Sequence, residues 1–545
     1  MNRFADLLDR LAFEPRRTGK LALLEAYFRA TPDPHRGWAL AALTGRLAFV
    51  HAKPGIIRAL AAERTDPVLF ALAYDFVGDL SETVALMWPA PRAGNGPPPP
   101  TLAEVVGALA AGTRSDLPAL VAGLLDGLDE TGRWALLKLI TGALRVGVSA
   151  RLAKTAVAGL GGIEPDAVEE VWHALEPPYE TLFAWVEGRG ERPSTDDPTP
   201  FRPPMLAQPL DEGELARLDP AEFAAEWKWD GIRVQAAAGL SDGRRVARLY
   251  SRTGEDVSAA FPDLLGVLDF DAALDGELLI VRDGRVEPFA VLQQRLNRKS
   301  VTQKMLAEFP PAIRAYDLLA EGGEDLRGLP FAERRRRLEA FVAGLGQPMI
   351  AVSPLIGFTG WDELAAARAD PAAGGAGVDA AAVEGVMLKR RDSLYLPGRP
   401  KGPWFKWKRD PMNVDAVLMY AQRGHGKRSS YYSDYTFGVW RGPEGAAELV
   451  PVGKAYFGFT DEELKRIDRF VRDATINRFG PVREVTHTPD EGLVFEVAFE
   501  GLMRSTRHKS GIAMRFPRIA RIRWDKPPRE ADRIETLERL LARRG

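Results

Sequence analysis

The chain has no cysteine among its 545 residues and only six histidines. Without cysteine it can form no disulfide, use no thiol nucleophile and build no cysteine zinc site. The histidines are scattered and form no HExxH pair. We therefore expect any bound metal to have carboxylate ligands, which suits magnesium or manganese.

Long apolar runs and a strong net charge are absent too. No stretch reaches the roughly 18 apolar residues of a membrane span, and the N-terminus lacks the pattern of a signal peptide. We expect a cytoplasmic protein that does not use a membrane. Because the net charge is only -2, any case for nucleic-acid binding must rest on local basic patches.

The first part of the chain has helical periodicity. Apolar residues between Phe4 and Leu11 fall on one helical face, and similar spacing recurs to about Leu175. A proline-rich segment from Pro89 to Pro100 is expected to link two helical subsets. This pattern predicts an all-α domain over residues 1–200, as one part of a multidomain chain.

The pattern changes after the polar, proline-broken segment 191–200. Short alternating strands with intervening helices predict an α+β domain over 201–410. A mostly β domain over 411–545 follows, with one helix expected around 461–479, and its length suits a small barrel. The arginine run from Glu333 to Arg337 has a helical pattern and is expected to be a solvated face.

The segment Glu226-Trp227-Lys228-Trp229-Asp230-Gly231-Ile232-Arg233 draws attention to Lys228. In a strand, Glu226, Lys228 and Asp230 point to one side, while the two tryptophans point to the other. Three ionisable groups then share one face. A β-hairpin surface would show the same pattern, so the tetrad Lys-x-Asp-Gly does not establish a site by itself.

Further segments follow the tetrad in a fixed order. They are Ser251–Asp256, Leu274–Leu279, Phe289–Arg295, Val383–Lys389 and Trp404–Lys408. This ordered set resembles the nucleotidyltransferase motifs of ATP-dependent polynucleotide ligases and their mRNA-capping relatives. Lys138–Val148 resembles a segment in the helical DNA-binding domain of DNA ligases, and Pro204–Ala207 resembles the entry into their adenylation domain.

The resemblance is therefore to the three-domain ATP-dependent DNA ligases. It implies a helical DNA-binding domain, an α+β nucleotidyltransferase (adenylation) domain and a C-terminal β-barrel of the oligonucleotide-binding type (OB-fold). It also implies a monomer that joins 3′-hydroxyl and 5′-phosphate ends at nicks in double-stranded DNA, through a lysine–AMP intermediate and adenylated DNA. Such an enzyme would serve DNA repair, replication or recombination.

The chemistry explains why a lysine needs such surroundings. An amine that attacks the α-phosphate of ATP must first be neutral. Burial and nearby cations such as Arg233, Arg252, Lys406 and Lys408 are expected to favour the neutral amine of Lys228, and bound magnesium would add to that effect. We expect Lys228 to be the residue that is adenylated.

The resemblance also assigns the contacts to the nucleotide. Glu226 is expected to recognise adenine, and Tyr316 occupies the place where relatives usually have a phenylalanine that stacks on the base. The alternative interpretation of Tyr316 is a half-buried aromatic residue of a strand. Lys389, Lys406 and Lys408 are placed around the phosphates.

Carboxylates are expected to bind ribose or the metal ion. Glu277 and Glu384 are the first candidates, and Asp230 and Asp275 are weaker ones. Strand alternation puts Asp275 and Glu277 on the same face, which permits a shared site. A lone Asp-Gly-Glu is nevertheless common in turns.

Relatives tend to have an arginine six residues ahead of Lys406, where this chain has Pro400. Arg399 or Lys401 could supply that cation, and we name Arg399 as the candidate.

The C-terminal region is locally basic. Between Leu502 and Lys526 stand Arg504, Arg507, Lys509, Arg515, Arg518, Arg521, Arg523 and Lys526, against the single acidic residue Asp525. Its end, Arg523-Trp524-Asp525-Lys526, resembles the last motif of the family, in which cations orient the leaving pyrophosphate. The resemblance implies that the barrel first closes over ATP and then swings to grip DNA through salt-sensitive phosphate contacts.

Other functions compete with this interpretation. An RNA ligase or a GTP-using capping-type nucleotidyltransferase would share the motifs, but neither is expected to bring the Lys138–Val148 segment. An NAD-dependent ligase usually has a cysteine zinc site, which this chain lacks. A catalytically silent DNA clamp would not need Lys228 and both glutamates.

Overall fold

The computed structural model divides the chain into two compact units, Met1–Thr195 and Asp196–Gly545. It describes residues 1–77, 79–89, 99–142, 144–193, 197–210, 212–296, 298, 301–424, 431–443, 445–506 and 508–544. Arg507 and parts of the proline-rich segment, of the segment 191–200 and of the Lys138–Val148 segment lie outside these residues. The domain boundaries at 200/201 and 410/411 stay predictions.

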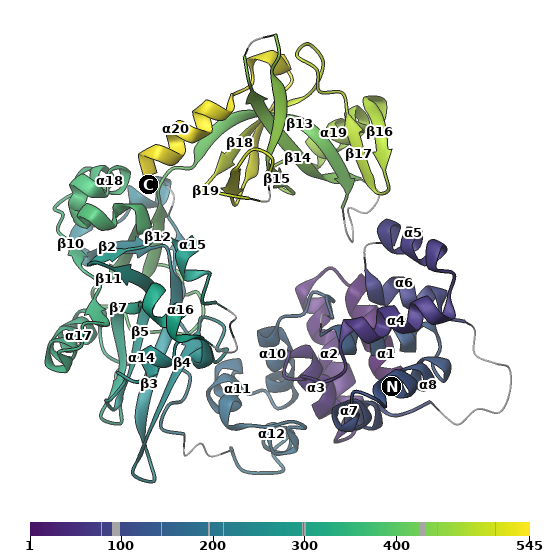
Figure 1. The fold of residues 1–545 in the computed structure, drawn as a ribbon. Coiled ribbons are helices and arrows are strands. Elements are labelled where there is room, and N and C mark those ends of the chain that lie inside the picture. The colour runs from purple at the N-terminus through teal and green to yellow at the C-terminus, as the bar shows by residue number, and fades with distance from the viewer. Residues whose placement is uncertain are drawn as a thin grey trace. The chain divides into compact units, whose positions relative to one another are not determined.

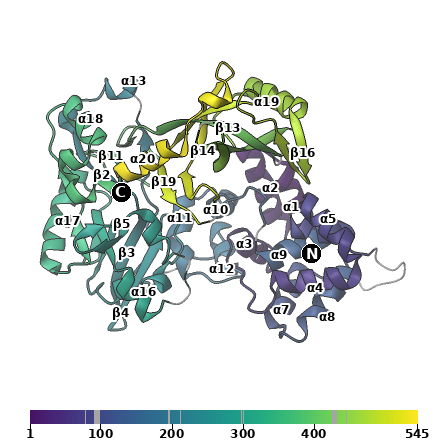
Figure 2. The ribbon, with the colours of Figure 1, turned by 45° about the horizontal axis from the view of Figure 1, so that its top comes forward.

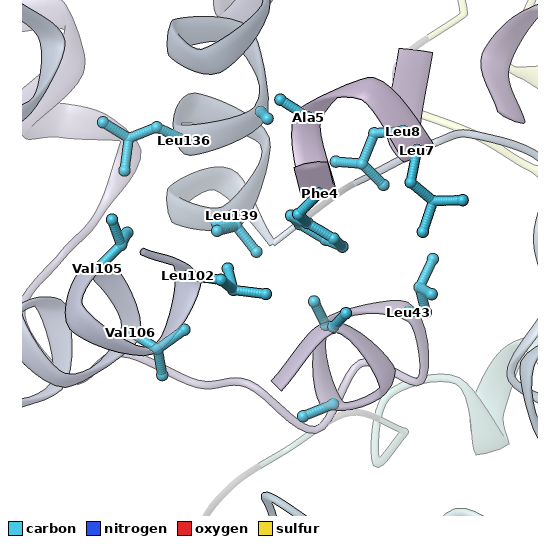
Figure 3. Close-up of a cluster of buried hydrophobic side chains, with 14 of the residues drawn as sticks. Phe4, Ala5, Leu7, Leu8, Leu43, Leu102, Val105, Val106, Leu136 and Leu139 are labelled. Carbon is cyan, nitrogen blue, oxygen red and sulfur yellow. The ribbon is translucent and has the colours of Figure 1, made fainter. Parts of the chain in front are cut away.

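The first unit is helical (Figure 1). Its helices are α1 (Asn2–Phe13), α2 (Arg17–Ala30), α3 (His35–Leu43), α4 (Pro54–Arg64), α5 (Pro67–Val77), α6 (Leu80–Met87), α7 (Leu102–Ala111), α8 (Leu117–Asp126), α9 (Glu130–Thr141), α10 (Ala150–Leu160), α11 (Pro165–Val171) and α12 (Glu180–Val186). The apolar face expected between Phe4 and Leu11 is buried on α1. Figure 3 shows it gathered with side chains such as Leu43, Leu102 and Leu139 in one core.

The Lys138–Val148 segment spans the end of α9 and the loop before α10. Gly142 ends α9 in the left-handed conformation that favours glycine, with φ of 70°. Lys138 is buried, and its ammonium donates to Asp79 at 2.7 Å. Ser149 then caps α10 by accepting from the backbone N–H of Leu152. In the described residues this segment therefore joins two helices of the core.

Two sheets open the second unit. The strands are β1 (Gln208–Pro209), β2 (Phe223–Trp229), β3 (Ile232–Ser241), β4 (Arg244–Ser251), β5 (Ala272–Arg282), β6 (Arg285–Val286), β7 (Pro311–Glu321), β8 (Glu324–Asp325), β9 (Ile350–Val352), β10 (Leu355–Ile356), β11 (Val383–Arg390) and β12 (Trp404–Lys408). The helices are α13 (Glu212–Leu215), α14 (Pro262–Leu265), α15 (Phe289–Leu292), α16 (Gln303–Glu308), α17 (Phe331–Leu345) and α18 (Trp361–Ala369). One sheet has the order β1-β12-β11-β2-β10 and the other β4-β3-β5-β7-β8, with β6 on β5 and β9 on β7.

A β-rich part follows, with helix α19 packed against β14 (Figure 2). Its elements are β13 (Met412–Arg423), β14 (Tyr432–Arg441), β15 (Glu448–Ala455), α19 (Asp461–Asp473), β16 (Thr475–Phe479), β17 (Val482–Val485), β18 (Val494–Phe499), β19 (Gly501–Arg504), β20 (Ile512–Arg515), β21 (Arg518–Arg523) and α20 (Ile534–Arg544). The expected helix over 461–479 was too long, because its last five residues form β16, which pairs with β17. Helix α20 was not expected.

The arginine run in α17 corrects a second expectation. Arg336 and Arg337 pair with Glu333 at the surface, as a solvated face would. Arg334 and Arg335, in contrast, are buried. Arg334 forms a two-bonded ion pair with Asp317 of β7, at 2.8 and 2.9 Å. This pair ties α17 to the sheet, because a buried guanidinium needs a matched carboxylate.

None of the helices in the described ranges combines the length and the apolar character that a membrane crossing requires.

Candidate active site

Strand β2 places Lys228 on one face of a five-stranded sheet. It pairs with β11, which in turn pairs with β12, so Lys228, Gly385 and Lys408 form one row across the sheet. The next row on the same face contains Glu226 and Lys406. Sheet pairing thus brings together charged residues that are about 180 positions apart in the sequence.

The opposite face of β2 supplies the packing. Trp227 and Trp229 are buried in an apolar cluster with Phe223, Val386 and Phe405. The alternation predicted from the sequence is therefore present, since the tryptophans anchor the strand while the ionisable side chains face the other way. Burial of such large rings on one face fixes the register of the other.

Gly385 allows β11 to come close to β12 beneath this row. Its φ is 152°, a conformation that L side chains rarely adopt. A Cβ placed there would overlap the carbonyl oxygen of Trp407 and approach the Cα of Lys408 to 2.8 Å. Gly385 is therefore required by the backbone conformation and by the close approach of β12, and it has no chemical group that could take part in a reaction.

A cavity of about 570 Å³ opens above these strands. Its size is that of a small-molecule site. Most of the residues named from the sequence line it, namely Glu226, Lys228, Arg233, Arg252, Glu277, Tyr316, Glu384, Lys389, Arg399, Lys406 and Lys408. Arg399 lines the cavity, whereas Lys401 is not among its lining residues.

One part of the cavity is built around a buried ion pair. The ammonium of Lys389 lies 2.9 Å from Glu226, and both side chains are 2% exposed. The same ammonium lies 4.3 Å from the ring centroid of Tyr316. Burial lowers the pKa of Lys389, although the charges of Glu226 and Asp317 oppose that shift. Glu226 Oε1 is the oxygen that faces this ammonium, although within the described residues the contact is not aligned as a hydrogen bond.

Arg233 is held rigidly beside this pair. It forms two hydrogen bonds with Asp275, at 2.9 and 2.5 Å, and donates to the carbonyl of Met205 at 2.6 Å. Tyr395 donates to the same carboxylate at 2.7 Å. Asp275 is 1% exposed and therefore serves Arg233 rather than the open cavity. Glu277, two residues later on β5, does line the cavity.

Carboxylates lie next to Lys228. The ammonium of Lys228 donates to Glu384. Burial acts to raise the pKa of Glu384, but the charge and hydrogen bond of Lys228, together with Lys408, hold it below its ordinary value. Burial raises the pKa of Asp230, a shift that Arg515 opposes and neighbouring Glu384 reinforces.

The pKa of Glu277 is shifted in the opposite direction to that of Glu384. Burial raises the pKa of its carboxyl to about 8, although Lys228 and Arg233 favour the charged form. The two glutamates that were expected to bind metal thus differ in protonation near neutral pH. A cation placed between them would favour ionisation of both.

The cavity also contains cations that lack carboxylate partners. In the described ranges, no ion pair is formed by Lys406, Arg252 or Arg399. Burial lowers the pKa of Lys406, and the charges of Arg399, Lys408, Lys228 and Arg252 lower it further. Mutual repulsion of this kind indicates an anion site.

The structure does not bring two of the predicted residues to the cavity. Arg523 and Lys526 lie on the barrel, where both bind Asp415, at 3.4 and 2.6 Å. The sequence interpretation in turn missed a residue that does reach the site. Arg515 of β20 binds Asp230 through two hydrogen bonds. In the sequence, Arg515 was one of several basic residues in the C-terminal stretch, and nothing distinguished it from the others.

Sequence comparisons relate the chain to known proteins. The family model for the ATP dependent DNA ligase domain matches residues 204–408, and that for the ATP dependent DNA ligase C terminal region matches residues 428–526. DNA ligase 1 of Korarchaeum cryptofilum (strain OPF8) is 33% identical over 79% of this chain and 75% of its own length. The chain belongs to the ATP-dependent DNA ligase family. As a member it is an enzyme that uses ATP and joins DNA, and the RNA ligase and capping alternatives are not favoured.

Two further matches extend over nearly the whole chain. The probable DNA ligase of Koribacter versatilis (strain Ellin345) is 31% identical over 99% of this chain and 96% of its own length. The solved structure named Pmar-Lig_Pre covers 96% of this chain and 99% of its own, with a TM-score of 0.56 and 14% identity. At that identity the likeness concerns the fold alone. It agrees with the predicted helical, nucleotidyltransferase and β-barrel parts.

Proposed function

We propose that this ligase seals nicks in duplex DNA through AMP carried on Lys228. The observation that supports the proposal best is the position of Lys228. It lies in one cavity with the buried pair of Glu226 and Lys389 and with Lys406, Arg252 and Arg399, which form no ion pair among the described residues. The cations suit a triphosphate, and the buried pair beside the Tyr316 ring suits a base.

The binding mode follows from these two parts. Adenine stacks on Tyr316, and the carboxylate of Glu226 accepts a hydrogen bond from the exocyclic amine, which guanine lacks at that position. Arg399, Lys406 and Lys408 neutralise the phosphates, and Arg252 supports them. Positioning and charge neutralisation supply most of the rate in phosphoryl transfer.

The reaction then has three transfers. The deprotonated nitrogen of Lys228 attacks the α-phosphorus of ATP, so that an N–P bond forms and pyrophosphate leaves. An oxygen of the 5′-phosphate at a nick next attacks the same phosphorus, which frees Lys228 and leaves AMP on the DNA. The 3′-hydroxyl finally attacks the 5′-phosphate, and AMP leaves.

Glu277 and Glu384 are the residues that would hold magnesium. Within the described residues there is no group of three or more acidic, histidine or cysteine side chains suited to a metal. Two carboxylates are nevertheless enough, because magnesium usually takes its other ligands from water and from the phosphates of the substrate. Bound there, the ion would neutralise charge on the phosphates as pyrophosphate leaves.

Labelling experiments test the proposal. The full chain is incubated with magnesium and with ATP or GTP labelled at the α-phosphate, and nicked duplex DNA or nicked RNA is then added. We expect label on the protein from ATP and not from GTP, loss of label in Lys228→Met, and transfer of AMP to nicked DNA. Retention of label in Lys228→Met would remove the proposed role of that lysine. Binding of nicked duplex by Lys228→Met shows that the variant is folded.

The proposal also specifies the DNA substrate and the oligomeric state. The DNA substrate is a nicked double strand, and the enzyme acts as a monomer. Sedimentation of the protein alone and with one equivalent of nicked duplex tests both, since a monomer forms a complex of one protein and one DNA. Sealing activity that appears only above a threshold protein concentration would contradict the monomer.

A further inference from the structure

Lys408 joins the cavity to the barrel. It is the last residue of β12, and its ammonium donates to both carboxylate oxygens of Glu500, at 2.9 and 2.8 Å. Glu500 stands between β18 and β19. The two side chains are 38% and 29% exposed. An ion pair so open to water contributes little net stability and can exchange its partner at small cost.

The pair between Lys389 and Glu226 behaves differently. Both of its side chains are 2% exposed, so separating them would leave the buried charge of Lys389 without its carboxylate. That pair is fixed, whereas the pair between Lys408 and Glu500 is exchangeable. A lysine that alternates between two anions needs a solvent-exposed environment such as that of Lys408.

Lys408 also belongs to the cation group of the cavity. Its charge contributes to the lowered pKa of Lys406 and to that of Glu384. In the part of the chain that the structure describes, Lys406, Arg252 and Arg399 have no carboxylate partner, while Lys408 has one from the barrel. Of these four cations, Lys408 is therefore the one that must give up a carboxylate before it can bind a phosphate.

We propose that Glu500 is a positioning residue whose carboxylate binds Lys408 at the place where a nucleotide phosphate would bind it. The contact between Lys408 and Glu500 and the binding of a triphosphate therefore exclude each other. The inference rests on the proposed function, in which Lys408 binds the phosphates of ATP. A triphosphate displaces the carboxylate because it brings several charges and more acceptor oxygens to the same ammonium. If Glu500 loses its charge, the ammonium of Lys408 is released before ATP binds.

A second contact keeps the barrel attached when Glu500 is changed. The backbone N–H of Glu500 donates to the carbonyl of Arg515 at 3.0 Å, and the Arg515 side chain binds Asp230. Removal of the Glu500 charge leaves both of these bonds intact. We therefore expect Glu500→Gln to fold and to release Lys408 alone.

The test is the ATP dependence of self-adenylation by the full chain at fixed magnesium. Glu500→Gln is compared with the natural sequence and with Glu448→Gln, which removes another exposed ion pair of the barrel, to Lys509 at 2.6 Å. We expect Glu500→Gln to lower the apparent KM for ATP by about five- to tenfold and to change kcat by less than about twofold. Glu448→Gln should leave both values unchanged.

Lys408→Met provides the cross-check. It should raise the KM, and Glu500→Gln should have no further effect on KM in that background, because the two changes act on one contact. Glu500→Asp, with a shorter reach, should give a KM between those of the natural protein and Glu500→Gln. An unchanged or raised KM in Glu500→Gln or Glu500→Asp, with thermal unfolding as in the natural protein, overturns the inference. Absence of any ATP label on the natural protein would instead contradict the proposed function.

Discussion

Arg515 and Asp230 are 285 residues apart in the sequence, and the guanidinium of one binds both carboxylate oxygens of the other, with Nη2 3.0 Å from Oδ1. Asp230 follows Lys228 by two positions, and Arg515 ends β20 of the barrel. The contact places a cation of the barrel beside Asp230, where it opposes the rise in the pKa of Asp230 that burial and the charge of Glu384 cause.

The first prediction concerns Arg515→Met. Arg515 opposes the upward shift in the pKa of Asp230, so its loss should raise that pKa further. Because an acid with a higher pKa is protonated over a wider range, the rate deficit of Arg515→Met in sealing should grow as pH falls and shrink as pH rises. The pH–rate profile of sealing measures this. In an Asp230→Asn background the deficit should not depend on pH, and a pH-dependent deficit there would assign the effect to another group.

The second prediction concerns Glu277 and magnesium. Its pKa of about 8 means that a proton competes with the metal below that pH. The magnesium concentration for half-maximal self-adenylation should rise by about tenfold for each pH unit below 8 and level off above it. Titrations between about pH 6 and pH 9 give this value separately from the maximal rate. Glu277→Gln should abolish the pH dependence, and a flat profile in the natural protein would exclude Glu277 as a ligand.

The third prediction concerns Gly385→Ala. Its backbone has φ of 152°, and a Cβ would overlap Trp407, so the strands must separate. We expect the free energy of unfolding to fall by about 1–3 kcal/mol, with slower self-adenylation because Lys228 and Lys408 share that row. Thermal unfolding and labelling measure the two effects. Gly357→Ala is the control, since a Cβ there meets nothing within 4 Å.

The fourth prediction concerns Arg523 and Lys526, which are expected to orient pyrophosphate. Both are held by Asp415 on the barrel, so they must leave that residue to act at the cavity. Arg523→Ala or Lys526→Ala should slow self-adenylation by at least about tenfold and affect sealing of pre-adenylated DNA less. Arg529→Ala, which breaks an exposed pair with Asp490, is the matched control. Equal losses in both assays would count against the assigned role.

Local pattern was enough for much of the site. The alternation of charged residues and tryptophans in β2 predicted which face Lys228 occupies, because side chains of a strand alternate between faces. The resemblance of the later segments to ligase motifs pointed to Glu277, Glu384 and Lys406, which line the cavity. Helical periodicity predicted the first unit, since its apolar spacing records which face is buried.

The sequence alone could not predict how charges are compensated over long distances. It did not show that Asp275 would bind Arg233, that Arg334 would be buried on Asp317, or that Arg515 would reach Asp230. Nor did it show that residues 475–479 would leave the helix to pair with β17.

The sequence by itself determined the local faces and the kinds of reactive group, because periodicity and residue chemistry are properties of neighbouring positions. Only the tertiary structure decided which carboxylate each cation meets. Lys408 ends beside Glu500 and Lys389 beside Glu226 because strand pairing and burial bring distant segments together. The pair of Lys389 and Glu226 is fixed because it is buried in a low dielectric, and the pair of Lys408 and Glu500 is exchangeable because water reaches it.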